Sequence, residues 1–379
     1  QEVCATSRGS PHLLPPAPQP ISPMVRAGCT GMVLPLPLLL LQLLLLQACA
    51  GSPTPRASGA AATCSLPDAD STAIPGHQLL QRRQGGAFVA GPLAETYQDF
   101  VPGQSKRIEG DDFRRLPLAP PDEEQKLWVF GYPSWQDTVI SARIATTGSW
   151  EGGKVARIRD TFRQTPGDGL NFLDLGGNIG TFTLPIAAFL AKRGGRVFAV
   201  EAMPSIAEHL KAGIVENGLR NVDLYSYAIA GPVADNTVAM ALGPKNKGGS
   251  AVMGNKVHPY RERTESAPLT TLDAMLRVEP GLRRLLVAKI DIEGNEGRAL
   301  QGAVRLLREV PPCYLLIELK ARFLAKAGSS VKEVADVLAS AGYDTAKVHA
   351  GQDTYWLEQR DLQRCLARLA AGGKPATTA

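Results

Sequence analysis

The feature of the sequence that most constrains its fold is an alternation of short apolar runs with longer helical patterns from Asn171 onward. Such alternation is typical of βαβ units, whose parallel strands form one sheet. The runs that we expect to be strands are 172–175, 197–200, 222–225, 285–292, 314–317 and 353–357. The clearest helix is predicted at 297–309, where Leu300, Val304 and Leu307 share one face. The sequence therefore predicts an α/β fold.

Composition excludes several classes of protein. The 379 residues are 44% apolar and 20% charged, which is too apolar for a disordered chain and too charged for a polytopic membrane protein. The net charge of +5 is too small for the concentrated basic face that a phosphate backbone requires. We therefore expect no nucleic-acid partner. The six cysteines include no C-x-x-C pair, so structural zinc is not expected.

The segment 24–50 has the pattern of a secretory signal peptide. Met24 and Arg26 precede an apolar block at 32–46, and small residues at 48 and 50 flank Cys49. The block is short for a transmembrane helix and contains glutamine and proline, which favours cleavage over an uncleaved signal anchor. A lipoprotein site at Cys49 is a third alternative. The leader predicts the secretory pathway, or the cytosol if it is an artefact of the gene model.

Composition also divides the chain into parts. The expected parts are a disordered or non-native upstream segment at 1–23, the leader at 24–50, a flexible linker at 51–86, an N-terminal lead-in subdomain at 87–166, the main α/β domain at 167–370 and a disordered tail at 371–379. Cleavage after residue 50 would leave Cys64, Cys313 and Cys365. An odd number fixes no pairing, and we expect Cys313, in a strand-like run, to be a buried thiol.

A glycine-rich turn follows the first strand of the main domain. It contains Asp174, Gly176, Gly177, Asn178 and Gly180. Glycines let the backbone turn tightly and let a ligand approach the start of the next helix. The dinucleotide pattern G-x-G-x-x-G fails here, whereas D-x-G-x-x-x-G fits. Because the carboxylate of Asp174 would repel a diphosphate by about 1 kcal/mol, the turn favours a cationic ligand such as S-adenosylmethionine.

A second acid supports a nucleoside ligand. Glu201 directly follows the apolar run 197–200 and comes 27 residues after Asp174. In a doubly wound sheet this strand tip faces the ribose, and a carboxylate can accept hydrogen bonds from both hydroxyls. Helix capping by both acids is the alternative, but it does not explain why both lie at strand ends.

The run 285–292 leads into a cluster of acids. Alternation places Lys289, Asp291 and Glu293 on one side of the strand, at the sheet edge where α/β proteins bind ligands. Asp291 and Glu293 are candidates for the group that orients or deprotonates an acceptor hydroxyl, with Lys289 tuning their charge. Capping of the next helix by Glu293 and Glu296 is the alternative. No histidine lies nearby in sequence, so no metal is expected.

Together these motifs resemble the FkbM family of S-adenosylmethionine-dependent methyltransferases. The resemblance spans 167–357 and is most specific in the Lys-Ile-Asp-Ile-Glu-Gly-x-Glu segment at 289–296. It implies a class I methyltransferase fold, a Rossmann-like three-layer sandwich with a mostly parallel seven-stranded sheet and one antiparallel edge strand. It also implies cofactor contacts from Asp174, Gly176, Gly177, Asn178, Gly180, Glu201 and Ala228. Ala202 departs from the family, which often has proline after the ribose-binding acid.

The expected activity is methylation of a carbohydrate or small-molecule hydroxyl with S-adenosylmethionine as the cofactor. The expected partner is therefore a small-molecule or glycan acceptor, with a membrane involved only if the leader is an uncleaved anchor. A polar segment at 243–258 suits a loop over the site, with His258 as a lesser candidate base, and Glu318 is placed to bound the substrate pocket. The alternatives are a NAD-dependent oxidoreductase and a catalytically inactive methyltransferase fold that binds a partner.

Overall fold

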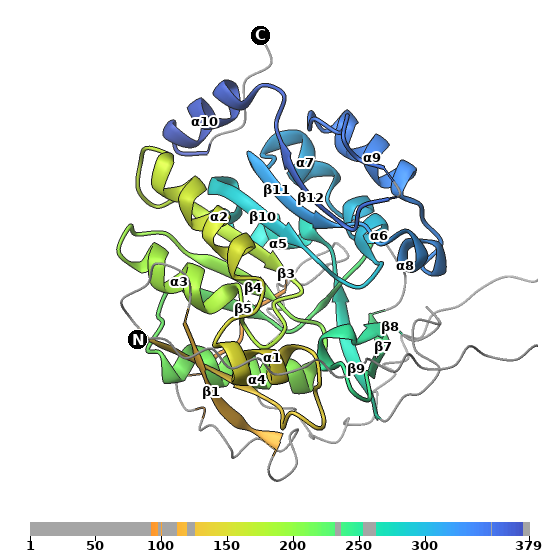
Figure 1. The fold of residues 1–379 in the computed structure, drawn as a ribbon. Coiled ribbons are helices and arrows are strands. Elements are labelled where there is room, and N and C mark those ends of the chain that lie inside the picture. Colours follow the sequence, from red (N-terminus) through yellow and green to blue (C-terminus); the bar gives the residue numbers. More distant parts are fainter. Residues whose placement is uncertain are drawn as a thin grey trace, which may run out of the picture. The chain divides into compact units, whose positions relative to one another are not determined.

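A six-stranded sheet with the order β12-β11-β10-β3-β4-β5 organises the computed structural model (Figure 1). The structure describes residues 92–97, 100, 112–119, 126–231, 236–252, 263–349 and 351–373. The predicted upstream segment, leader and linker lie outside this part of the chain, as does most of the predicted tail. Within it, no helix has the length and apolar character needed to cross a membrane.

The six strands of this sheet are those predicted from the apolar runs. They are β3 (Asn171–Leu175), β4 (Val197–Val200), β5 (Val222–Tyr225), β10 (Leu285–Ile290), β11 (Tyr314–Glu318) and β12 (Thr354–Glu358). All pair in parallel except β12, which is antiparallel to β11 at the edge. The expected seventh strand is not confirmed, because the described residues contribute six strands to this sheet. After β12 the chain forms the amphipathic helix α10 (Leu362–Ala370) instead.

Helices cover both faces of the sheet, which gives the α/β fold three layers (Figure 1). One face carries α2 (Gly152–Gln164), α3 (Thr183–Ala191), α4 (Pro204–Glu216) and α10, and the other carries α5 (Leu272–Val278), α6 (Glu296–Gln301), α7 (Val304–Glu309), α8 (Ala321–Lys326) and α9 (Val331–Ser340). Neighbouring strand residues divide between the two cores, as Phe172 and Leu173 do. This burial on both faces explains why the strands read as unbroken apolar runs.

The single helix predicted at 297–309 is wrong, because the structure has α6 and α7 in its place. The break falls at Gly302, where a Cβ atom would lie 2.1 Å from the backbone oxygen of Ala230. The carboxylate of Asp273 accepts hydrogen bonds from the backbone N–H groups of Arg305 and Leu306, both at 2.9 Å, and so starts α7. Both causes are tertiary contacts, which the periodicity of the segment does not encode.

The residues before the main domain share its core. They form the antiparallel pair β1 (Arg114–Leu118) and β2 (Leu127–Gly131), then α1 (Ile140–Thr147) and α2. Val129 and Phe162 pack in the same cluster as Phe172 of β3. The side chain of Asn217 holds β2 against the end of α4, since it accepts from the backbone N–H of Trp128 at 2.9 Å and donates to its oxygen at 2.6 Å. The predicted boundary between 166 and 167 stays a prediction.

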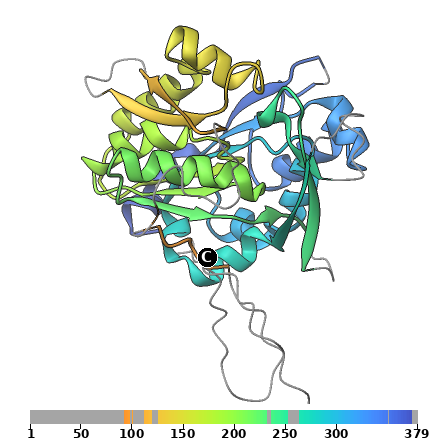
Figure 2. The ribbon, with the colours of Figure 1, turned by 90° about the horizontal axis from the view of Figure 1, so that it is seen from below.

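A second, four-stranded sheet was not predicted. Its strands are β6 (Ala228–Ile229), β7 (Thr237–Leu242), β8 (Ala251–Val252) and β9 (Arg263–Thr270), in the order β6-β9-β7-β8. A short 3-10 helix, η2 (Lys247–Gly249), connects β7 to β8, and a second one, η3 (Pro280–Arg284), directly precedes β10. Figure 2 shows this sheet at the margin of the described elements. β9 contains a proline and several polar residues, so it presents no apolar run.

Cys313, just before β11, forms a disulfide with Cys365 of α10. The expectation that Cys313 is a free thiol is therefore wrong. The two residues are 52 positions apart, and their Cα atoms lie 5.6 Å apart because α10 packs back against the main sheet. Cysteine spacing alone does not specify such a contact.

Loss of this disulfide should lower stability. A Cys313→Ser/Cys365→Ser variant is expected to lose about 4 kcal/mol in free energy of unfolding, because a bond across 52 residues restricts the unfolded chain. Urea unfolding of the oxidised protein measures this difference. The control is Cys64→Ser, which should match the wild type. An equal unfolding midpoint for the double variant and the wild type would contradict the prediction.

Candidate active site

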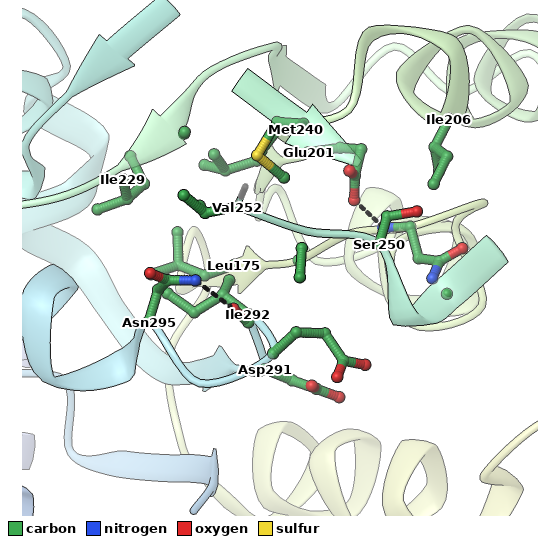
Figure 3. Close-up of a pocket in the computed structure, with 18 of the residues that line it drawn as sticks. Leu175, Glu201, Ile206, Ile229, Met240, Ser250, Val252, Asp291, Ile292 and Asn295 are labelled. Carbon is green, nitrogen blue, oxygen red and sulfur yellow. Dashed lines mark hydrogen bonds between the residues drawn. The ribbon is translucent and has the colours of Figure 1, made fainter. Parts of the chain in front are cut away.

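A cavity of about 550 Å³ lies at the carboxyl ends of β3, β4 and β10 (Figure 3). The second sheet lines it from β6, β7, β8 and β9. Its lining includes eight residues that the sequence nominated, namely Gly176, Asn178, Glu201, Ala228, Lys289, Asp291, Glu293 and Glu318. Strand ends far apart in sequence thus meet at one edge of the sheet, as ligand sites in open α/β sheets do.

The glycine-rich turn is held in place by tight backbone contacts. Gly176 has φ +81°, and a Cβ atom there would lie 1.9 Å from the backbone oxygen of Asp291. The N–H groups of Gly176 and Gly177 both donate to the oxygen of Val200 at 2.9 Å. Gly177 and Gly180 lie outside the cavity lining and support the turn from behind. Close packing against the backbone after β10 therefore requires glycine at position 176, where the turn lines the cavity.

Glu201 faces the cavity from the end of β4. Its side chain accepts hydrogen bonds from the backbone N–H groups of Asn178 and Met203, both at 2.8 Å. Burial raises the pKa of Glu201 to about 7, although both N–H donors act to lower it. Each carboxylate oxygen keeps a lone pair that can accept from a hydroxyl, so the group suits the ribose contact that the sequence predicted.

Asp174 is fully buried and does not line the cavity. Its carboxylate accepts a hydrogen bond from the hydroxyl of Thr183 at 2.7 Å, and its other oxygen lies 3.2 Å from Nζ of Lys289. Its link to the cavity therefore passes through Lys289. The predicted contact between Asp174 and the cofactor stays a prediction.

Lys289 joins the glycine-rich turn to the acidic strand end. Its ammonium donates to the backbone oxygens of Gly176 at 3.0 Å and Leu175 at 3.3 Å, and it lies 4.0 Å from Asp291. Burial acts to lower the pKa of Lys289, but the carboxylates of Asp174 and Asp291 outweigh it and raise the pKa above its ordinary value. The ammonium therefore stays charged and fixes the spacing between the turn and β10.

Three carboxylates lie on the side of the cavity opposite Glu201 (Figure 3). Asp291, Glu293 and Glu318 each place an oxygen within 4.8 Å of the others. Burial raises the pKa of Glu293 to about 8, with the charge of Asp291 adding to the effect. Burial and Asp291 likewise raise the pKa of Glu318 to about 7, while Lys320, 2.9 Å away, acts to lower it. Lys320 already balances one charge here, and the predicted absence of a metal stays a prediction.

Glu296 is the first residue of α6, whereas Glu293 precedes the helix. Glu296 is buried, and its side chain accepts from the N–H groups of Ile292 at 3.0 Å and Gly294 at 3.2 Å. It therefore shapes the turn after β10. Glu293 instead lines the cavity with a left-handed backbone at φ +54°.

Sequence reasoning missed the residues that complete the cavity. Trp150 and Glu151 come from the corner between α1 and α2, and Val238 and Met240 come from β7 of the second sheet. The backbone dihedral angles, which the sequence does not reveal, also mark this cavity. Among the described residues, the three non-glycine residues with positive φ are Glu151, Asn178 and Glu293, and all three line the cavity. Strained residues often mark functional sites.

The loop predicted to cover the site does contribute to its lining. Asn246 and Gly248 line the cavity, and a Cβ atom at Gly248 would lie 2.8 Å from the side-chain nitrogen of Asn178. The described part of this loop ends at residue 252. His258 lies outside the described residues, so its candidacy as a base stays a prediction.

Comparison with known proteins finds similarity to methyltransferases. The family model for the Methyltransferase FkbM domain matches residues 174–345. Similar solved structures include the methyltransferase FkbM from Methylobacillus flagellatus KT (16% identity, 51% of this chain and 44% of that chain, TM-score 0.32) and a SAM-dependent methyltransferase from Agrobacterium tumefaciens (13% identity, 62% and 60%, TM-score 0.33). Among curated proteins no match is found.

The matched segment begins at Asp174 and contains both the glycine-rich turn and the acidic motif after β10. The resemblance read from these motifs is thereby confirmed. Residues 174–345 are thus similar to the FkbM methyltransferase domain, whose cofactor is S-adenosylmethionine.

Proposed function

We propose that this chain transfers a methyl group to a hydroxyl of a carbohydrate or another small polar acceptor. One observation carries the proposal. Glu201 lies on one side of the cavity and Asp291 on the opposite side, with apolar residues such as Met240 and Val252 beside them (Figure 3). A carboxylate suited to a ribose and carboxylates suited to an acceptor hydroxyl thus share one space.

The residues on the Glu201 side fit the cofactor. The backbone of Gly176 lines the cavity at the turn, and Glu201 offers oxygens to the ribose hydroxyls. Ile206 and Ala228 add apolar lining suited to an adenine ring. These residues account for each chemical part of the nucleoside.

The carboxylates of Asp291 and Glu293 handle the proton of the acceptor hydroxyl. Bound S-adenosylmethionine would supply the methyl group of its sulfonium to the acceptor oxygen, and S-adenosylhomocysteine would be the leaving product. Glu293 accepts the hydroxyl proton, since burial raises its pKa to about 8 and makes it a stronger base than an ordinary carboxylate. Asp291 orients the hydroxyl, and Lys289 holds Asp291 beside the turn. Positioning of the two reactants supplies most of the expected acceleration.

A methyl-transfer screen tests the proposal. The full chain would be incubated with S-adenosylmethionine carrying a labelled methyl group and a panel of glycans and hydroxylated metabolites. Label in an acid-stable ether of one acceptor class is the expected result. Calorimetry with S-adenosylhomocysteine and NAD completes the test. Binding of NAD alone would favour an oxidoreductase, and partner binding unchanged by Asp174→Ala would favour an inactive scaffold.

We further propose that the enzyme works in the secretory pathway. The leader pattern at 24–50 supports this location, and so does the Cys313–Cys365 disulfide, because disulfides persist mainly in oxidising compartments. Maleimide labelling of intact cells, followed by denaturation, tests the proposal. Cys313 and Cys365 should resist labelling until the protein is reduced. Labelling of both without reduction would place the chain in a reducing compartment.

A Glu201→Gln variant is expected to bind S-adenosylhomocysteine roughly 10- to 100-fold more weakly, because hydrogen bonds to a charged group contribute about 1.5–3 kcal/mol. The amide loses the charge and turns a donor toward one of the N–H groups that the carboxylate accepts. Calorimetry measures the dissociation constant. Glu216→Gln, at a surface ion pair with Arg115, is the control and should bind normally. Equal affinity in both variants would remove Glu201 from the cofactor site.

A further inference from the structure

A second hollow lies away from the active site. It occupies about 680 Å³ between α7, α9 and α10, which lie near one another at one end of the main sheet (Figure 1). Pro311, just before β11, is part of its lining, so the hollow is at the amino end of that strand. The cofactor cavity is at the carboxyl ends. The two sites share no lining residue.

The floor of this groove is apolar. Leu300 and Leu307 are buried at its base, while Val304 and Val337 are 57% and 41% exposed. These two valines are half of the four large hydrophobic side chains that are exposed among the described residues. An exposed apolar surface in a hollow is typical of a binding site rather than of ordinary protein surface.

The rim of the groove is basic. It carries Arg308, Arg360, Arg364 and Arg368. Its two acids already have partners, since Glu309 pairs with Arg305 at 3.1 Å and with Arg308 at 3.5 Å, and Asp361 accepts from the backbone N–H of Arg364 at 3.0 Å. The guanidinium of Arg308 is mostly exposed. The rim therefore offers positive charge around an apolar floor.

The disulfide fixes one wall of the groove. Cys365 lines it, and its bond to Cys313 ties α10 to the chain just before β11. Arg368 adds hydrogen bonds to the oxygens of Arg283 at 3.0 Å and Pro311 at 2.6 Å. The wall is therefore preorganised, which lowers the entropic cost of binding.

We propose that this groove binds an amphipathic helical segment of a partner protein, with apolar residues on one face and acidic residues beside them. The apolar face would contact Val304 and Val337, and the acidic residues would pair with Arg308 and Arg364. A helix laid in an apolar groove is a common mode of peptide recognition, and guanidinium groups pair well with carboxylates. The binding leaves the cofactor cavity open, because the two sites lie at opposite ends of the strands.

The shape and chemistry of the groove favour a peptide over other anionic ligands. A flat bilayer does not reach Leu300 and Leu307, which are buried at the base of the hollow. A small inorganic anion gains nothing from the apolar floor, since its charge needs hydrogen-bond donors on every side. Charge complementarity thus selects an acidic segment, and the apolar floor selects an amphipathic one.

Peptide display on the full, oxidised chain tests the proposal. A random 16-residue peptide library would be selected against the wild type and counter-selected against a Val337→Asp/Arg364→Glu variant. Selected peptides should carry apolar residues at helical spacing with aspartate or glutamate beside them. Synthetic copies should bind the double variant at least about tenfold more weakly in fluorescence anisotropy, the size expected for loss of an interface anchor.

A matched variant separates this site from general surface effects. Val278→Asp/Arg220→Glu introduces the same changes at an exposed valine and an exposed arginine elsewhere, and should bind the selected peptides like the wild type. Thermal unfolding confirms that both variants are folded. Basic selected peptides, equal binding to all three proteins, no discriminating peptide, or stronger binding to phosphatidylserine vesicles than to any peptide would each overturn the proposal.

Discussion

A Glu293→Gln variant should lose about 10²- to 10⁴-fold in kcat, the usual contribution of a positioned general base. The amide keeps the size of the side chain and the left-handed backbone at φ +54°, but it accepts no proton. The affinity for S-adenosylhomocysteine should change little, because Glu293 lies away from Glu201. Steady-state kinetics on the acceptor found in the methyl-transfer screen, with calorimetry for the cofactor, separates these two effects.

The pH dependence of the wild-type reaction rate tests the role of Glu293 independently. Burial raises the pKa of Glu293 to about 8, and a base acts only when deprotonated. The rate should therefore rise with pH until about pH 8 and then level off. In Glu293→Gln this rise should disappear, whereas it should persist in Glu333→Gln, a change on the exposed side of α9. An unchanged profile in Glu293→Gln would assign the proton transfer to another group.

A Gly176→Ala variant should bind no measurable cofactor and should lose about 3 kcal/mol or more of stability. The added Cβ atom would lie 1.9 Å from the oxygen of Asp291, in a backbone conformation at φ +81° that favours glycine. The turn has to move. The hydrogen bonds from Gly176 to Val200 and from Lys289 to Gly176 then break. Calorimetry with S-adenosylhomocysteine and thermal unfolding measure the two losses.

The matched control for this variant is Gly153→Ala. Gly153 lies in α2 with no atom within 4 Å of the position of an added Cβ, and its φ is not positive. Alanine there should leave cofactor binding unchanged and stabilise the helix by roughly 0.5–1 kcal/mol. If Gly176→Ala binds the cofactor like Gly153→Ala does, the turn is not the rigid element described above.

Much of the main sheet and cofactor side could be predicted because their signals are local. A buried parallel strand reads as an apolar run, and an acid or glycine directly after it lies at the sheet edge wherever the strand sits. Gly176, Glu201 and Asp291 met in one cavity for that reason. Asp174 lies within β3 rather than after it, and it is buried beneath the turn because alternation along the strand directs it toward Thr183 and Lys289.

The remaining features depend on contacts between distant segments. The disulfide partner of Cys313 depends on where α10 packs, and the break between α6 and α7 depends on Ala230. Lys320 follows β11 with no motif around it, and only the fold brings it to Glu318. The strands of the second sheet are short or of mixed polarity, so their pairing with one another determines where they form. Periodicity within one segment carries none of this information.

Within the described part of the chain, the strands of the second sheet pair only with one another, although they line much of the cavity. These strands can therefore change their lining side chains without disturbing the hydrogen-bond ladder that positions the turn, Glu201 and Asp291. Acceptor specificity can thus change between homologous chains while cofactor binding stays the same. Chains that keep the same six strands and exchange the residues of β7 and β8 would be expected to methylate different acceptors with unchanged chemistry.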